Sequence, residues 1–164
     1  ASGSVGTYAV QLAKHFGAEV TGVCSTANLE MVNSLGADQV IDYTKEDFKL
    51  RKEKFDIIFD ASGHESYITC KHLLKKTGSY ITTLPRPKLL LHKLISFFSN
   101  GSVKTLLMKS NHKDLDFINE LVLKGFIKVK IDKEFSLDKI TDAHAYVELG
   151  HTEGKIVVNI QNNE

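Results

Sequence analysis

Helical and strand-like spacings of apolar residues alternate through the first half of the chain. Apolar positions at the i, i+3, i+4 spacing predict helices over residues 9–16, 29–35 and 65–75, the last with Tyr67, Cys70 and Leu74 on one face. Short apolar runs predict strands at residues 19–24, 39–41, 55–59 and 78–83. Strands that alternate with helices of about ten residues form crossover units, and such units build a parallel sheet. The pattern therefore predicts an α/β fold with a doubly wound parallel sheet.

The second half of the chain has a less regular pattern, and Pro85 and Pro87 separate it from the first. Strands are predicted over residues 102–109, 127–131 and 155–160. Two helices are predicted to begin at Asp114 and Ser136 and to end at Gly125 and Gly150. The polar tail at residues 161–164 is expected to fray.

The composition fits one ordinary domain. With 164 residues, of which 42% are hydrophobic and 25% charged, the chain can bury a core, and its net charge of +1 argues against a nucleic-acid partner. No apolar run approaches the roughly 20 residues of a membrane-spanning helix, so no membrane partner is expected. Cys24 and Cys70 form no metal-ligand cluster, and two isolated cysteines favour a reducing, cytoplasmic compartment.

Gly3, Ser4, Val5 and Gly6 form a glycine-containing turn directly before the first helix. Such a turn offers backbone N–H groups and the positive end of the helix dipole to an anion, and glycines let a pyrophosphate approach the backbone. We interpret these four residues as the phosphate-binding turn of a dinucleotide-binding fold. The alternative is a tight turn whose glycines serve only close packing.

Further candidate site residues follow the predicted strands, at the sheet edge where ligands of parallel sheets bind. They are Ser25, Thr26 and Asn28 after the first strand, Tyr43 after the second, Ser62 and Gly63 after the third, and Leu84 after the fourth. Three of these groups have a structural alternative. Ser25 and Thr26 would only cap a helix, Tyr43 would be a half-buried aromatic at a strand end, and Leu84 would pack in the core.

The position some twenty residues after the glycines bears on the choice of coenzyme. NAD-binding folds usually place Asp or Glu there, on the ribose hydroxyls, whereas this chain has Ser25 and Thr26. Small hydroxyl side chains leave room for a 2′-phosphate and can donate hydrogen bonds to it. We therefore expect NADP(H) to be favoured over NAD(H).

Four stretches together resemble the medium-chain dehydrogenase/reductase superfamily, in its quinone-oxidoreductase and zinc-type alcohol dehydrogenase-like branch. They are residues 1–20, 34–48, 55–63 and 135–158. The resemblance implies a Rossmann-type NAD(P)-binding domain at residues 1–127 and a short return into the catalytic domain at residues 128–164. The family's catalytic domain and the strand that feeds Gly3 would precede Ala1. We therefore expect these residues to be part of a longer protein, and to be marginally stable and inactive alone.

The resemblance also implies hydride transfer between a nicotinamide coenzyme and a small carbonyl, enone or quinone. Tyr43 matches the family tyrosine that flanks the adenosine phosphate. The matched motifs supply no acid–base residue, so the catalytic residues stay unassigned. The zinc ligands of zinc-using relatives lie in the preceding domain, so the residues of this chain do not decide whether the intact protein uses zinc, and no metal ligand is predicted here. Relatives dimerise through an edge strand, and residues 102–109 suggest a homodimer of the intact protein. The alternative function is a non-catalytic dinucleotide-binding module that serves in regulation or interaction.

Overall fold

The computed structural model describes residues 1–84, 101–109, 111–150 and 152–160. The chain divides into two compact units. The first unit contains Ala1–Glu46 and Asn111–Glu164, and the second contains Asp47–Ser110. Pro85, Pro87 and the tail at 161–164 lie outside the described residues. Among the described residues, no helix is both long and apolar enough to cross a bilayer.

The start of the first unit follows the predicted alternation of helices and strands. Its elements are α1 (Gly6–His15), β1 (Thr21–Cys24), α2 (Leu29–Ser34) and β2 (Gln39–Asp42). β1 and β2 pair in parallel from Thr21 opposite Gln39 to Cys24 opposite Asp42. Val10, Cys24, Val32 and Ala37 form the buried core between these elements. Gly17 and Gly36 follow the two helices with φ of +79° and +99°, a conformation that glycine adopts without strain.

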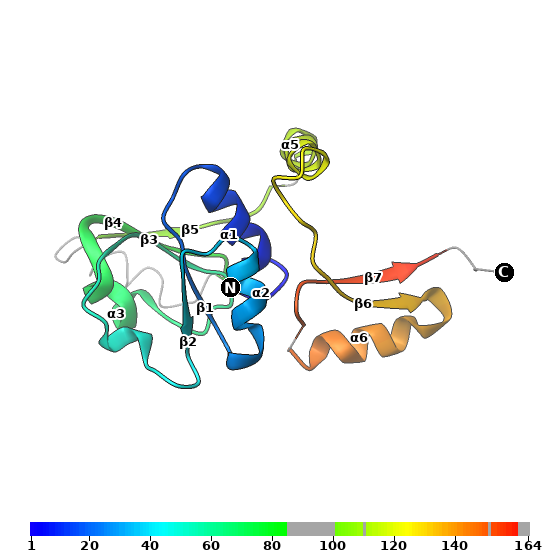
Figure 1. Ribbon diagram of the computed structural model, residues 1–164, viewed down its shortest axis with the longest axis horizontal. Coiled ribbons are helices and arrows are strands. Elements are labelled where there is room, and N and C mark those ends of the chain that lie inside the picture. Colours follow the sequence, from blue (N-terminus) through cyan, green and yellow to red (C-terminus); the bar gives the residue numbers. More distant parts are fainter. Residues whose placement is uncertain (85–100, 110, 151, 161–164) are drawn as a thin grey trace. The chain divides into compact units, whose positions relative to one another are not determined.

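The rest of the first unit contains α5 (His112–Leu123), β6 (Ile131–Ser136), α6 (Ile140–Glu148) and β7 (Lys155–Asn159). β6 and β7 pair in parallel, and α6 lies along the pair (Figure 1). The N-cap of α5 is Asn111, whose side chain accepts a hydrogen bond from Lys113 N, and Asp114 lies in the first turn instead of capping the helix. Ser136 precedes a 3-10 turn, Leu137–Lys139, and α6 follows that turn.

The predicted strand over residues 127–131 is wrong, because the strand begins only at Ile131. The segment before it is held by a side chain of α1. The Gln11 amide donates to Lys128 O at 3.0 Å and accepts from Lys128 N at 2.7 Å. These bonds satisfy backbone groups that a strand would pair with a neighbouring strand.

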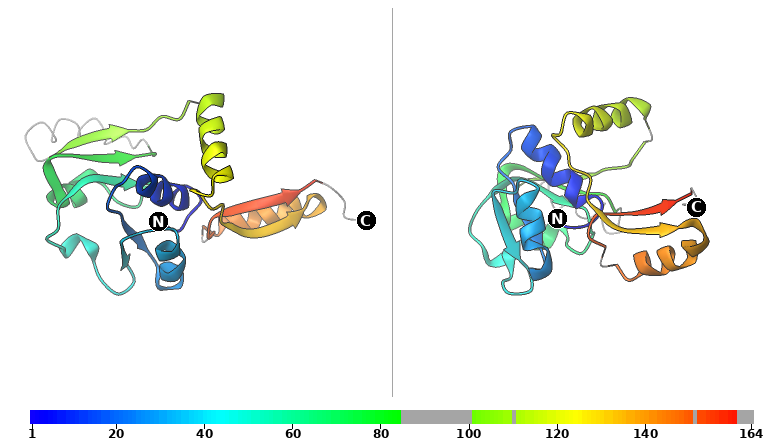
Figure 2. Two further views of the ribbon diagram at one scale, coloured as in Figure 1. Left: turned by 45° about the horizontal axis from the view of Figure 1, so that its top comes forward. Right: turned by 45° about the vertical axis from the view of Figure 1, so that its right-hand side comes forward.

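The second unit is a three-stranded parallel sheet with one short helix. Its elements are β3 (Phe55–Asp60), α3 (Tyr67–Cys70), β4 (Leu74–Thr82) and β5 (Ser102–Thr105). The strand order is β3-β4-β5, and the three strands run side by side in Figure 2. β5 ends at Thr105 instead of the predicted residue 109. Thr105 is paired with Thr82, the last residue of β4, so residues after Thr105 have no strand beside them with which to pair.

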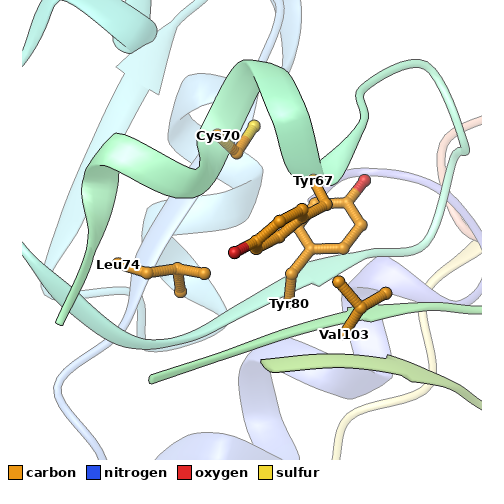
Figure 3. Packing of buried hydrophobic residues seen from close by; sticks show 5 residues of the cluster. All are labelled: Tyr67, Cys70, Leu74, Tyr80 and Val103. Carbon is orange, nitrogen blue, oxygen red and sulfur yellow. The ribbon is translucent and has the colours of Figure 1, made fainter. Parts of the chain in front are cut away.

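The predicted helix over residues 65–75 is present from Tyr67 to Leu73, as α3 followed by a 3-10 turn at Lys71–Leu73, and residues 74–75 are not helical. A capping box between Ser66 and Thr69 fixes the start of α3. α3 ends at Cys70, and Leu74 already pairs with Phe55 as the first residue of β4. The predicted apolar face is nevertheless buried in one cluster, because Tyr67, Cys70 and Leu74 pack with Tyr80 and Val103 (Figure 3). The rings of Tyr67 and Tyr80 meet edge to face, 6.3 Å apart.

The pairing in the described residues confirms the α/β class with parallel strands. In the described residues, β1 pairs only with β2, and β3 pairs only with β4. The side chain of Ile57, on β3, is 60% exposed.

Candidate functional site

The two glycines of the turn before α1 have different structural roles. A Cβ added to Gly6 would lie 2.5 Å from Ala1 O and 2.7 Å from Ala1 C, so close packing of the backbone requires glycine there. A Cβ added to Gly3 would meet no atom within 4 Å. The packing alternative therefore accounts for Gly6 and not for Gly3. The first turn of α1 carries no acidic side chain, which leaves its N–H groups and dipole favourable to an anion.

The glycine turn lies beside the carboxyl end of β1. The Ala1 nitrogen donates to Val23 O at 2.6 Å, and the Ala1 side chain packs against the core cluster around Cys24. Ser25 follows Cys24 directly. The first unit thus brings the glycine turn and the Ser25–Asn28 loop to one place.

Asn28 is the most deeply buried residue of that loop, with 8% of its surface exposed. Its Nδ2 donates to Ser25 Oγ at 3.2 Å, whereas its Oδ1 is buried and has no hydrogen-bond partner in the described part of the chain. The Ser25 side chain makes no capping bond to the helical turn that follows, so the capping alternative fails for Ser25. An amide with one unsatisfied buried arm is a position where a polar ligand group completes the hydrogen bonding.

Thr26 is bound to an aspartate that the sequence reasoning did not select. Its Oγ1 donates to Asp42 Oδ2 at 2.5 Å, and Thr44 donates to Asp42 Oδ1 from Oγ1 at 2.6 Å and from N at 3.0 Å. These hydrogen bonds, led by that of Thr26, lower the pKa of Asp42 below its ordinary value. In this structure the one hydroxyl proton of Thr26 is directed at Asp42.

Tyr43 follows Asp42, and its side chain is 58% exposed instead of half-buried. Its backbone N donates to Cys24 O at 3.1 Å, which holds the residue at the carboxyl end of β1. Tyr43 therefore lies on the same side of the first unit as Ser25 and Thr26. The only local signal for Asp42 is the Asp-x-Thr pattern at the end of the predicted strand, which is typical of an Asx turn, whereas its contact with Thr26 is not local.

The second unit brings together Ser62, Gly63 and Leu84. Gly63 has a φ of +69°, and a Cβ there would overlap Leu84 Cδ1. Leu84 is 49% exposed, so it is not an ordinary core residue. The loop is fixed by Asp60, which accepts from Gly63 N at 2.7 Å and from Ser62 Oγ at 3.3 Å.

Asp60 and its partner Tyr80 were not predicted as site residues. The Tyr80 hydroxyl donates to Asp60 Oδ2 at 2.8 Å, and both residues are buried. Burial raises the pKa of Tyr80, and the hydrogen bond to the Asp60 carboxylate raises it further. Tyr80 is therefore held protonated as a donor to Asp60. That contact joins β3 to β4, a pairing that local sequence patterns do not reveal.

The described residues contain no group of three or more His, Cys, Asp or Glu side chains placed to hold a metal ion. They do fit a dinucleotide in two respects, the open position at Gly3 and the unsatisfied arm of Asn28. A separate open hollow of about 470 Å³ lies on β6 and α6. Its Lys133 ammonium already lies over the rings of Phe135 and Tyr146, 5.1 and 4.9 Å from their centroids.

Residues 35–158 match the model of a family described as zinc-binding dehydrogenase. Over 96% of its length the chain is 38% identical to the chloroplastic quinone-oxidoreductase QR1 of Triphysaria versicolor and covers 50% of that protein. It is 35% identical to the chloroplastic NADPH-dependent alkenal/one oxidoreductase of Arabidopsis thaliana, with 96% of the chain and 38% of that protein covered.

Among solved structures, the quinone oxidoreductase from Coxiella burnetii matches with a TM-score of 0.87 and 30% identity, over 98% of this chain and 50% of that one. The fold is therefore that of a Rossmann-like α/β protein. The chain spans half or less of the length of these relatives.

Proposed function

Because the chain belongs to the zinc-binding dehydrogenase family, within the medium-chain dehydrogenase/reductase superfamily, we propose that it is the coenzyme-binding part of an NAD(P)H-dependent oxidoreductase. The observation that carries the proposal is the open position at Gly3, at the start of α1. A backbone without a side chain at a helix N-terminus can approach a diphosphate closely. Gly3, Ser4, Val5 and Gly6 would bind that diphosphate.

The other candidate residues would hold the two ends of the coenzyme. Ser25, Thr26, Asn28 and Tyr43 would surround the adenosine ribose. Ser62, Gly63 and Leu84 would contact the nicotinamide half. A bound nicotinamide coenzyme supplies the hydride, and the residues of this chain bind and orient it. No residue of this chain is assigned as an acid or base.

For the coenzyme we propose NADP(H) over NAD(H). No carboxylate occupies positions 25 and 26, and one relative is named as NADPH-dependent. Calorimetric titration of the full-length protein tests this proposal. NADPH should bind much more tightly than NADH, and equal dissociation constants would rule the preference out.

For the substrate we propose a small quinone, enone or carbonyl. The relatives are named for quinone and alkenal/one chemistry. The full-length protein should oxidise NADPH in the presence of a quinone or an enone. A protein that binds NADPH and reduces neither acceptor would instead be a non-catalytic dinucleotide-binding module.

We also propose the division at residue 127 between the coenzyme domain and the return into the catalytic domain, and a homodimer of the intact protein. A monomeric mass in light scattering would contradict the dimer.

We propose a cytoplasmic compartment from the two isolated cysteines, although the two plant relatives are named as chloroplastic.

A further inference from the structure

Asp42 occupies the carboxyl end of β2 and holds the loop that carries Thr26. Only 8% of its surface is exposed. Oδ2 accepts from Thr26 Oγ1 at 2.5 Å, and Oδ1 accepts from Thr44 Oγ1 at 2.6 Å. The two hydroxyls are themselves 2.9 Å apart. A hydroxyl has one proton, so both threonines use theirs within this group.

The group therefore presents acceptors to any ligand beside it. Thr26 Oγ1 keeps a lone pair, and the carboxylate keeps its negative charge. Lys45 Nζ lies 3.7 Å from Asp42 Oδ2, but its side chain is 68% exposed, so water screens this pair. A ribose 2′-hydroxyl can donate to such a group. A 2′-phosphate has only acceptor oxygens and is repelled by the carboxylate.

We propose that Asp42 is a specificity-determining residue that weakens binding of the 2′-phosphorylated coenzyme relative to the unphosphorylated one. The inference rests on the proposed function, because it places the adenosine ribose beside Thr26. The charge of Asp42 would also limit how strongly the protein prefers NADP(H) over NAD(H). The hydroxyl side chains leave room for the phosphate, whereas Asp42 withholds the Thr26 proton from it and adds a like charge.

The test compares coenzymes on the full-length protein and on its Asp42→Asn variant. Asparagine keeps the shape of the side chain, removes the charge and frees the Thr26 proton. Calorimetry is done with NADPH, NADH, 2′,5′-ADP and 5′-AMP, since the last two probe the adenosine end alone. Binding of NADPH and 2′,5′-ADP should tighten about three- to tenfold, the size expected for one screened like charge removed from near a phosphate. NADH and 5′-AMP should change less than about twofold, as expected for a neutral ribose.

Asp38→Asn is the matched control. It removes the same charge just before β2, where Asp38 pairs with Lys14 at 2.7 Å. Four residues of extended chain separate it from Asp42, about 13 Å, which exceeds the screening length in physiological salt. The ratio of NADPH to NADH affinity should stay at its wild-type value in this variant.

An unchanged ratio in a folded Asp42→Asn protein, or equal weakening of both coenzymes, would overturn the inference while leaving the proposed function intact. Wild-type protein that binds none of the four compounds would overturn both. If circular dichroism shows that Asp42→Asn does not fold, Asp42→Ser carries the test. It removes the same charge, so binding of NADPH should again tighten relative to NADH, and an unchanged ratio would refute the role of Asp42.

Discussion

Alanine substitution of the two turn glycines should separate coenzyme binding from folding. At Gly6 the new methyl group would meet Ala1 O at 2.5 Å, Ala1 C at 2.7 Å and Ala1 Cα at 2.9 Å, all of them backbone atoms. Relief requires Ala1 to move, and Ala1 is held by its hydrogen bond to Val23 O. At Gly3 the methyl group would enter open space.

The two variants differ in the free energy of unfolding. Overpacking at Gly6 should cost about 1–3 kcal/mol. The better helix propensity of alanine returns up to about 1 kcal/mol of this. Since the overlapping atoms belong to the backbone of Ala1, we expect an overpacking cost of about 2–3 kcal/mol and a net destabilisation of Gly6→Ala of about 1–2 kcal/mol. Gly3 does not have a positive φ, so alanine fits its backbone. Gly3→Ala should be unchanged or stabilised by up to about 1 kcal/mol, because the unfolded chain loses freedom.

Urea unfolding and calorimetric titration with NADPH measure the two effects on the full-length protein. Gly3→Ala should keep its unfolding midpoint and bind NADPH at least about tenfold more weakly, because the methyl group occupies the approach of the diphosphate. Wild-type affinity in Gly3→Ala would show that the open position at Gly3 is not a coenzyme site. Wild-type stability in Gly6→Ala would show that the close approach to Ala1 is not a constraint on the fold.

Three further predictions concern buried polar groups. Tyr80→Phe leaves Asp60 Oδ2 without its hydroxyl donor and should lower the free energy of unfolding by about 1–3 kcal/mol in urea titrations. Gln11→Leu leaves the N–H and C=O of Lys128 without their amide partner and should lower the free energy of unfolding by about 2–4 kcal/mol in the same measurement. A negligible loss would contradict this and show that water replaces the amide. The lowered pKa of Asp42 means that its stabilisation is complete above the unfolded-state pKa of about 4 and is lost as the pH falls through the folded-state pKa. Unfolding midpoints between about pH 2 and pH 6 should therefore fall less steeply in Asp42→Asn than in the wild type.

Sequence patterns within a few residues predicted the helix ends and the order of helices and strands in the first half of the chain. Gly17 and Gly36 mark helix ends because their left-handed φ suits only glycine-like residues. The helices and strands up to residue 60 were also predicted in type and order, because local apolar spacing decides them. The helix predicted over residues 65–75 ends at Leu73 because Leu74 pairs with Phe55, a contact across nineteen positions that outweighs helical spacing.

The candidate site was predictable to a similar extent. Gly3 and Gly6 were found from a helix-start pattern, although the different packing of the two required the structure. Asp42 was passed over because its main partner, Thr26, lies sixteen positions away. Asp60 was passed over because Tyr80 is twenty positions away. Such partners become visible only once parallel pairing brings the strand ends together.

Asp42 and Asp60 are built alike, which indicates how the loops around them are kept in shape. Each lies at the end of a parallel strand, has only 8% of its surface exposed, and accepts a hydrogen bond from a hydroxyl of a neighbouring element. Each also accepts a backbone N–H from two or three residues further along, at Thr44 and Gly63. A loop fixed in this way loses little conformational entropy when a ligand binds, so the contacts made by neighbouring residues contribute more fully to affinity. The sequence places candidate coenzyme residues on both loops, Thr26 and Tyr43 around the first aspartate and Ser62 and Gly63 beside the second. The buried carboxylates would therefore act as supports for binding, with Asp42 also setting which ribose is accepted.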